Sequence, residues 1–209
     1  MASVWEVATL MPTNPVPAKL AEAKYFLERM QEVREFHQQF AYNLSAFLSA
    51  TYSVIDFLWS YYKPGRRTDF EEWWEELELP RDPVYRFFRK TRDVTLHRLP
   101  VPVRQEEIRY RVEKREGLDN EEHADLVEIR QGLYTVRVSA TGPDAAESIA
   151  KEKLGGLLET TTYEWWFDDL WFDDLPEQLS HHNKVLELAA YYVDGVEQVV
   201  VQALERFGE

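Results

Sequence analysis

The stretch PVYRFFRKTRDVTLH, residues 83–97, is the part of the sequence on which the predicted fold is built. Asp82 and Pro83 form a helix start, because a capping side chain is followed by proline at the first helical position. Pro100 disfavours helical backbone in the residue before it, so the helix has to end at about Arg98. The local signals therefore predict a helix from Pro83 to about Arg98.

Hydrophobic residues recur with helical spacing on both sides of this stretch. The predicted helices cover residues 18–42, 43–62 and 183–207, and a short acidic aromatic helix lies in residues 70–80. Ile108, Tyr110 and Val112 alternate with arginines, which is the period of a strand, and residues 126–129 and 133–138 are further strand candidates. We therefore predict a mainly α fold: an up-and-down helical bundle of four or five main helices with a small antiparallel β-hairpin insertion. Residues 1–209 are expected to form a single helical domain, with residues 101–178 as the insertion.

Composition excludes several classes of protein. Of the 209 residues 44% are hydrophobic and 14% aromatic, enough for a substantial core. The absence of cysteine excludes disulfides, thiolate metal sites and cysteine nucleophiles. No apolar run is long enough to span a bilayer, and residues 1–10 lack the pattern of a secretory signal, so we expect a cytoplasmic protein without membrane association. His181 and His182 lack the partners and the spacing of a metal site, and neither a metal nor a cofactor is expected.

Charge is distributed unevenly along the chain. The net charge is -14, of which residues 1–100 contribute -1 and residues 101–209 contribute -13. A strongly acidic chain repels polyanions at long range, which argues against indiscriminate phosphate binding. From Arg81 to Arg98, however, six basic residues accompany two acidic ones. A local site for an anion is therefore predicted on this helix.

Arg92, Asp93 and His97 are the candidate catalytic residues of the helix. Arg92 and His97 form an R-x4-H pattern, but five residues advance a helix by about 140° beyond a full turn, so the two side chains do not share one face. Asp93 and His97 do share a face, and the carboxylate is placed to orient the imidazole. The helix dipole favours a protonated His97 in the last turn. An imidazole that moves a proton and a guanidinium that stabilises phosphate charge suit phosphodiester cleavage without a metal, and the 140° separation predicts that a second copy completes the site.

The chain resembles the HEPN superfamily, an all-α nucleotide-associated domain whose ribonuclease members carry an R-x4-6-H motif. The resemblance lies in FAYNLSAFLSATYSV (residues 40–54), in RFFRKTRDVTLH (residues 86–97) and in the terminal helix, and it covers about residues 18–98 and 180–208. It implies a HEPN-like domain that acts as a metal-independent endoribonuclease and as a homodimer, with Arg92 and His97 catalytic and Asp93 as the polar neighbour. On this interpretation Arg86, Arg89 and Lys90 bind the substrate. The partners would be RNA and, for a toxin or host-defence effector, a cognate antitoxin-like protein.

Three alternatives are weighed against this interpretation. The helical domain could be a catalytically inert dimerisation or binding module of the same architecture. The tandem repeat WFDDLWFDDL, residues 166–175, lies in a stretch from Glu159 to Glu177 with seven carboxylates and no basic residue, which could cover the basic helix as a phosphate mimic. Trp165, Trp166 and Trp171 could stack bases, although closing a core or an interface is the simpler role for them.

Overall fold

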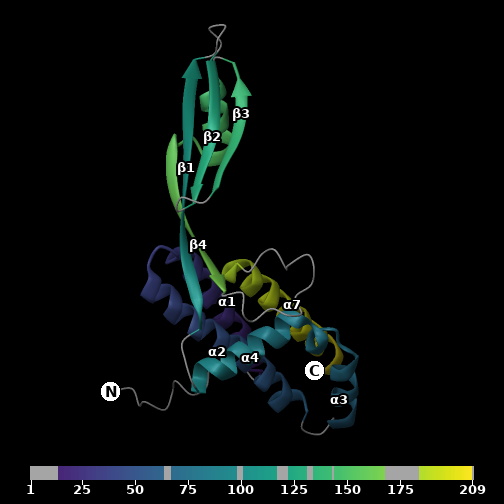
Figure 1. Ribbon diagram of the computed structural model, residues 1–209. Helices are drawn as coiled ribbons and strands as arrows, with labels where there is room; N and C mark the ends of the chain where they lie inside the picture. Colours follow the sequence, from purple (N-terminus) through teal and green to yellow (C-terminus); the bar gives the residue numbers. More distant parts are fainter. Residues whose placement is uncertain are drawn as a thin grey trace, which may run out of the picture. The chain divides into compact units, whose positions relative to one another are not determined.

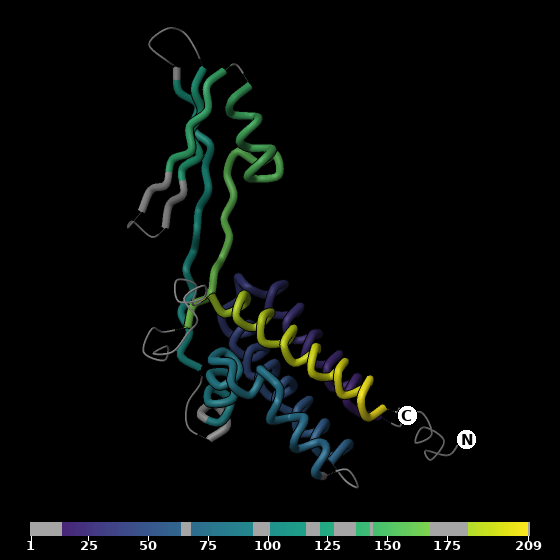
Figure 2. Tube along the Cα trace, turned by 90° about the vertical axis from the view of Figure 1, so that its right-hand side faces the viewer, coloured from purple at the N-terminus to yellow at the C-terminus, as the bar shows by residue number. Residues whose placement is uncertain are grey.

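The computed structural model describes residues 14–63, 67–97, 101–116, 122–130, 134–142, 144–167 and 184–208. The chain divides into two compact units. Residues 1–103 with 167–209 form one, called here the helical unit, and residues 104–166 form the other, called the sheet unit. Figures 1 and 2 show the elements of both units.

The helical unit contains five α-helices and one 3-10 helix among its described residues. Their bounds are α1 Val16–Glu32, α2 His37–Tyr62, α3 Arg67–Glu76, η2 Leu79–Arg81, α4 Pro83–His97 and α7 Val185–Phe207. The predicted helix from Pro83 is confirmed in α4. No described helix has both the length and the apolar character needed to cross a membrane.

The first two helices meet at a different point from the one predicted. The sequence pattern places their boundary at residues 42 and 43, whereas α1 ends at Glu32 and α2 begins at His37. Phe36 is extended, and its N–H donates to the carbonyl of Val33 across the turn. Neither glycine nor proline marks this turn, so the hydrophobic period runs on through it and hides the boundary.

The terminal helix confirms its predicted apolar face. α7 begins at Val185, and every residue assigned to the face is buried. These residues are Val185, Leu188, Ala189, Tyr192, Val196, Val199, Val200, Ala203 and Phe207. They recur at helical spacing and pack against the other helices of the unit, which accounts for the stability of so long a helix.

An aromatic cluster joins three helices of this unit. The rings of Phe88 in α4 and Tyr192 in α7 are stacked, with centroids 4.6 Å apart and planes 12° from parallel. Phe47 in α2 lies edge-on to both, with centroids 6.1 Å and 6.3 Å away. Phe167 completes the cluster 5.8 Å from Phe88. Aromatic pairs in these geometries add to the burial of their apolar area, so the cluster fixes α4 against α2 and α7.

The sheet unit is built on four strands in the order β3-β2-β1-β4. The elements are β1 Val103–Glu116, β2 Glu122–Arg130, β3 Tyr134–Thr141, α5 Ala145–Leu154 and β4 Glu159–Phe167. The strands are antiparallel to their neighbours, with Val112 opposite Leu126 and Ala124 opposite Ala140. Val112, Ala124 and Leu126 form one core cluster with the buried face of α5, which lies beside the sheet in Figure 2.

The predicted fold class is therefore wrong. The chain is a mixed α and β protein with a substantial antiparallel sheet, not a mainly α bundle with a small hairpin insertion. The sequence pattern indicates β1 only around Ile108 and Val112, because charged residues occupy both faces of the strand beyond them and leave no alternation to detect. In the sequence, β4 is not recognisable as a strand and belongs to an acidic segment. Its partner β1 is far away along the chain, so no hairpin turn marks the pair.

Asp82 confirms its predicted role as the cap of α4. Its Oδ1 accepts a hydrogen bond from the backbone N–H of Tyr85 at 3.0 Å, and its Oδ2 accepts one from the hydroxyl of Tyr191 at 2.8 Å. Replacing Asp82 with alanine removes both bonds, and we expect the free energy of unfolding to fall by about 1–2 kcal/mol. Urea unfolding followed by far-UV circular dichroism measures the loss.

Two control variants separate the contributions to this loss. Asp82→Asn keeps a capping oxygen and should cost only about 0.3 kcal/mol. Tyr191→Phe removes only the bond to α7. An Asp82→Ala variant as stable as the wild type would show that α4 does not depend on this cap.

Candidate functional site

The predicted site residues lie on α4, whose last residue is His97. Arg86, Arg89 and Lys90 are exposed, Arg92 is half-buried and Asp93 is exposed. The side chain of His97 lies outside the part of the chain that the structure describes. All six predicted residues therefore lie on α4. The structure describes the side chains of five of them, and only the backbone of His97.

The guanidinium of Arg92 is held from two sides. Its Cζ lies 3.8 Å from the centroid of the Tyr52 ring of α2, which is cation–π contact. Its Nη1 donates to Oδ1 of Asp93 at 3.1 Å. The side chain is 23% exposed, and its Nε is buried without a hydrogen-bond acceptor. Arg92 is therefore partly desolvated, oriented and still open to solvent at one end.

Asp93 has a contact that its predicted role does not include. The carboxylate is expected to orient His97 one turn away, and the structure shows it accepting from Arg92 instead. Because the side chain of His97 is outside the described residues, an additional contact between Asp93 and His97 stays a prediction. The pair of Arg92 and Asp93 reduces the net positive charge that the end of the helix presents.

A second group of side chains surrounds the arginines. Tyr52 and Asp56 come from α2, one turn apart, and Tyr85, Arg89 and Arg92 come from α4. We call these five residues the α2–α4 cluster. Sequence reasoning identified Arg89 and Arg92 but missed the other three. The spacing of Tyr52 and Asp56 is visible in the sequence, but nothing local shows that α4 lies against that face of α2.

Burial and charge act in opposite directions on the titratable groups of this cluster. Burial raises the pKa of the Asp56 carboxyl above its ordinary value, and the guanidiniums of Arg92 and Arg89 oppose that rise. Burial also raises the pKa of the Tyr85 phenol, while the Arg89 guanidinium acts to lower it. The phenol of Tyr192 in α7 is buried behind the cluster, and its pKa is raised for the same reason. The phenols of Tyr85 and Tyr192 are therefore neutral at physiological pH, and Asp56 is the one carboxyl group of the cluster, beside its two guanidiniums.

This arrangement suits the binding of a phosphate group. Guanidiniums bind phosphate oxygens through charge-assisted hydrogen bonds, and two of them lie one helical turn apart on the same side of α4. The phenols of Tyr85 and Tyr192 supply no competing negative charge, because their pKa values are raised. In an acidic protein, α4 with the facing side of α2 is therefore a region of the described chain that suits an anion.

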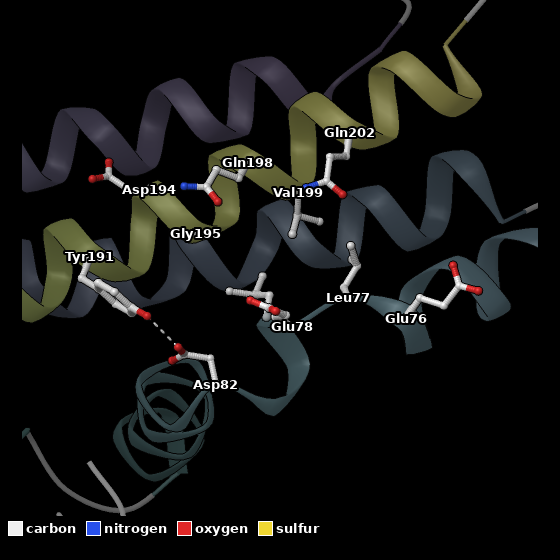
Figure 3. Close-up of a pocket in the computed structure, with 11 residues that line it drawn as sticks. Glu76, Leu77, Glu78, Asp82, Tyr191, Asp194, Gly195, Gln198, Val199 and Gln202 are labelled. Carbon is white, nitrogen blue, oxygen red and sulfur yellow. Dashed lines mark hydrogen bonds between the residues drawn. The ribbon is translucent and has the colours of Figure 1, made fainter. Parts of the chain in front are cut away.

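A groove elsewhere in the helical unit has the opposite character. It lies between η2 and α7, holds about 480 Å³ and is shown in Figure 3. Its lining includes the carboxylates of Glu76, Glu78, Asp82 and Asp194. Such a lining repels phosphate. Among the described residues, no group of three or more His, Asp or Glu side chains is placed to hold a metal ion.

Most of the acidic repeat lies outside the described residues, as do Trp171, His181 and His182. Its first two residues are described at the end of β4, where Phe167 is 1% exposed and packs against Phe87 and Phe88. Trp165 is also 1% exposed. Trp165 therefore serves a core, as the simpler interpretation holds. The hypothesis that the acidic residues cover α4 stays a prediction.

Comparisons of the chain with family models, with curated proteins and with solved structures found no match. The resemblance to the HEPN superfamily therefore rests on the R-x4-H motif and on the helices that carry it. The chemistry of α4 and of the α2 residues that face it is the basis for assigning a function.

Proposed function

We propose that the protein is a metal-independent endoribonuclease of HEPN type that acts as a homodimer in the cytoplasm. His97 is the general acid and base, Arg92 stabilises the charge that develops on the phosphate, and Asp93 orients its neighbours. Arg86, Arg89 and Lys90 bind the RNA backbone. One observation supports this proposal most strongly: the guanidinium of Arg92 is held in place by Tyr52 and Asp93 near the end of a helix that ends at His97.

The reaction needs one proton taken up and one delivered. The imidazole of one His97 removes the proton of a ribose 2′-hydroxyl, and the oxygen attacks the adjacent phosphorus. The bond from phosphorus to the 5′-oxygen breaks, and the same imidazole, now protonated, gives that oxygen its proton. The products are a 2′,3′-cyclic phosphate and a free 5′-hydroxyl. Arg92 offsets the negative charge that accumulates on the phosphate oxygens in the transition state.

This reaction requires residues from two copies of the chain. On one helix Arg92 and His97 point about 140° apart, so one copy does not present both to a single phosphate. A two-fold axis beside the end of α4 would bring Arg92 of one protomer near His97 of its partner. The active form is therefore a dimer with two equivalent composite sites.

A second candidate function is an inert dimerisation or binding module. The contacts of Arg92 favour this second function. Its Nη1 donates to Asp93 and its guanidinium contacts Tyr52, so part of its binding capacity is used within the chain. In this role the protein would bind RNA or a cognate antitoxin-like protein without cleaving RNA. The two functions differ in whether a phosphodiester bond is broken.

The test is RNA cleavage in the presence of EDTA. Purified protein is incubated with a structured RNA in excess EDTA, and the ends of the fragments are analysed by mass spectrometry. We expect cleavage that EDTA does not reduce, with 2′,3′-cyclic phosphate and 5′-hydroxyl ends. RNA that remains intact while bound would favour the binding module, and cleavage that EDTA abolishes would overturn the metal-independent mechanism.

A further inference from the structure

The α2–α4 cluster provides more than a support for Arg92, and any role it has in binding RNA rests on the proposed function. On α2, Tyr52 and Asp56 are four residues apart, and on α4, Arg89 and Arg92 are three residues apart. Residues at these spacings lie next to each other on a helix surface. The cation–π contact of Tyr52 with Arg92 and the electrostatic interaction of Asp56 with both arginines show that these two pairs face each other.

Arg89 is the uncommitted cation of this cluster. Its side chain is exposed, and it forms no ion pair within the described part of the chain. The carboxyl group of Asp56 interacts electrostatically with Arg89, yet no ion pair within the described ranges joins Asp56 to Arg89 or Arg92. The positive charge of Arg89 is therefore available to a ligand.

Arg92 is committed only in part. The ring of Tyr52 contacts the guanidinium, and Asp93 accepts a hydrogen bond from Nη1. Nε is buried without a hydrogen-bond acceptor. A buried donor without an acceptor is unfavourable. An oxygen atom that approached the guanidinium and, after a small rotation of the side chain, bonded this nitrogen would relieve that cost. The arrangement points to an anion with several oxygens, and a backbone phosphate has that chemistry.

We propose that Arg89 and Arg92 together bind one backbone phosphate of single-stranded RNA, and that Tyr52 is the positioning residue that holds the guanidinium of Arg92 for it. Asp56 opposes this binding, because its carboxylate faces the same two guanidiniums. Tyr52 acts through the face of its ring, so its hydroxyl is dispensable. Tyr52 contacts Arg92 and not the reacting atoms.

The experiment measures binding of an RNA that is not cleaved. The probe is a single-stranded RNA with 2′-O-methyl groups throughout, which lacks the attacking hydroxyl, and its affinity is measured at several salt concentrations. Cleavage of the same sequence with free 2′-hydroxyls is measured in parallel. The variants are Tyr52→Leu, Tyr52→Phe, Asp56→Asn and Arg89→Ala. Arg29→Ala on α1, a half-buried arginine paired with Glu32, is the control for loss of one arginine outside the cluster.

We expect Tyr52→Leu to weaken binding about 10-fold and Tyr52→Phe to change it less than about twofold, because phenylalanine keeps the ring face. Asp56→Asn should strengthen binding by about threefold through loss of one facing charge. Arg89→Ala should reduce the slope of log affinity against log salt by about 0.7, the value for one phosphate contact on a single strand. Arg29→Ala should leave the slope unchanged. Thermal melting of each variant confirms that it is folded.

The outcomes separate this inference from the proposed function. Suppose that the wild type cleaves RNA, but that folded Tyr52→Leu and Arg89→Ala bind the probe with unchanged affinity and salt slope. This result would overturn the phosphate site without contradicting the proposed nuclease activity. Binding of the probe with the expected changes, but no cleavage of the unmodified RNA, would overturn the nuclease and support the phosphate site. A wild type that neither binds nor cleaves would overturn both.

Discussion

Replacing His97 with alanine is expected to lower the rate of RNA cleavage by about 10²–10⁴-fold, the usual contribution of a general acid and base. Replacing Arg92 with alanine is expected to lower it by about 10²–10³-fold, because the charge on the phosphate in the transition state loses its stabilising guanidinium. Arg92→Lys should recover little of the loss, since an ammonium group does not reproduce the flat contact with Tyr52. The rates are measured under single-turnover conditions with enzyme in excess.

Mixing the two inactive variants tests the composite site. In a dimer of one His97→Ala chain and one Arg92→Ala chain, one of the two sites contains an intact Arg92 and an intact His97. About half of the dimers are mixed after exchange of protomers, so about a quarter of the wild-type activity should return. A mixture of Arg86→Ala and His97→Ala serves as a second pair of variants. The cleavage rate of each variant alone is the baseline for its mixture.

The mixing experiment has a clear opposite result. No recovery in a mixture shown to exchange protomers would mean that Arg92 and His97 of the same chain serve one site. The helix would then have to change shape near its end, because the two residues lie about 140° apart on a regular helix. Equal activity of wild type and both single variants would remove this pair from the chemistry altogether.

Replacing Phe88 with alanine is expected to lower the free energy of unfolding of the helical unit by about 3–5 kcal/mol. Phe88 is buried, is stacked on Tyr192 and contacts Phe47 and Phe167, so its removal leaves a cavity where α2, α4 and α7 meet. The loss is a large fraction of the roughly 5–15 kcal/mol that is typical of a whole domain. Urea unfolding followed by circular dichroism at the helix band measures it.

Two neighbouring variants make this prediction specific. Phe88→Leu keeps most of the volume and should cost about 1–1.5 kcal/mol. Arg86→Ala, on the exposed side of the same helix, should change stability by less than about 0.5 kcal/mol. A Phe88→Ala variant within about 1 kcal/mol of the wild type would mean that the helices are not joined at this residue. Because the chain has two units, the sheet unit is expected to unfold in its own transition.

Local signals explain which parts of the fold could be predicted. Asp82 and Pro83 mark the start of α4 by the chemistry of a helix N-terminus, and the structure places the cap where they predict it. The apolar face of α7 is predictable from its period, because a helix that buries one side has to repeat every three to four residues. The predicted break between α1 and α2 is misplaced, because the turn at residues 33–36 contains no residue typical of turns.

The fold class depended on pairing between distant residues. β1 and β4 are neighbours in the sheet, and the N–H of Val112 donates to the carbonyl of Leu158. Nothing in the sequence of either strand indicates which strand it pairs with. A strand with charges on both faces, such as β1, also lacks the alternation that identifies shorter strands. The sheet unit is therefore visible in the sequence only as a small hairpin.

The candidate site divides in the same way. The sequence by itself determined α4, its cap, its basic residues and the R-x4-H spacing, because each of these depends on residues within a few turns of one another. Only the tertiary structure decided that Tyr52 lies under Arg92, that Asp56 opposes Arg89 and Arg92, and that β4 completes a sheet. These contacts join segments far apart in the chain, and the burial of aromatic side chains such as Phe88 and Tyr192 brings those segments together.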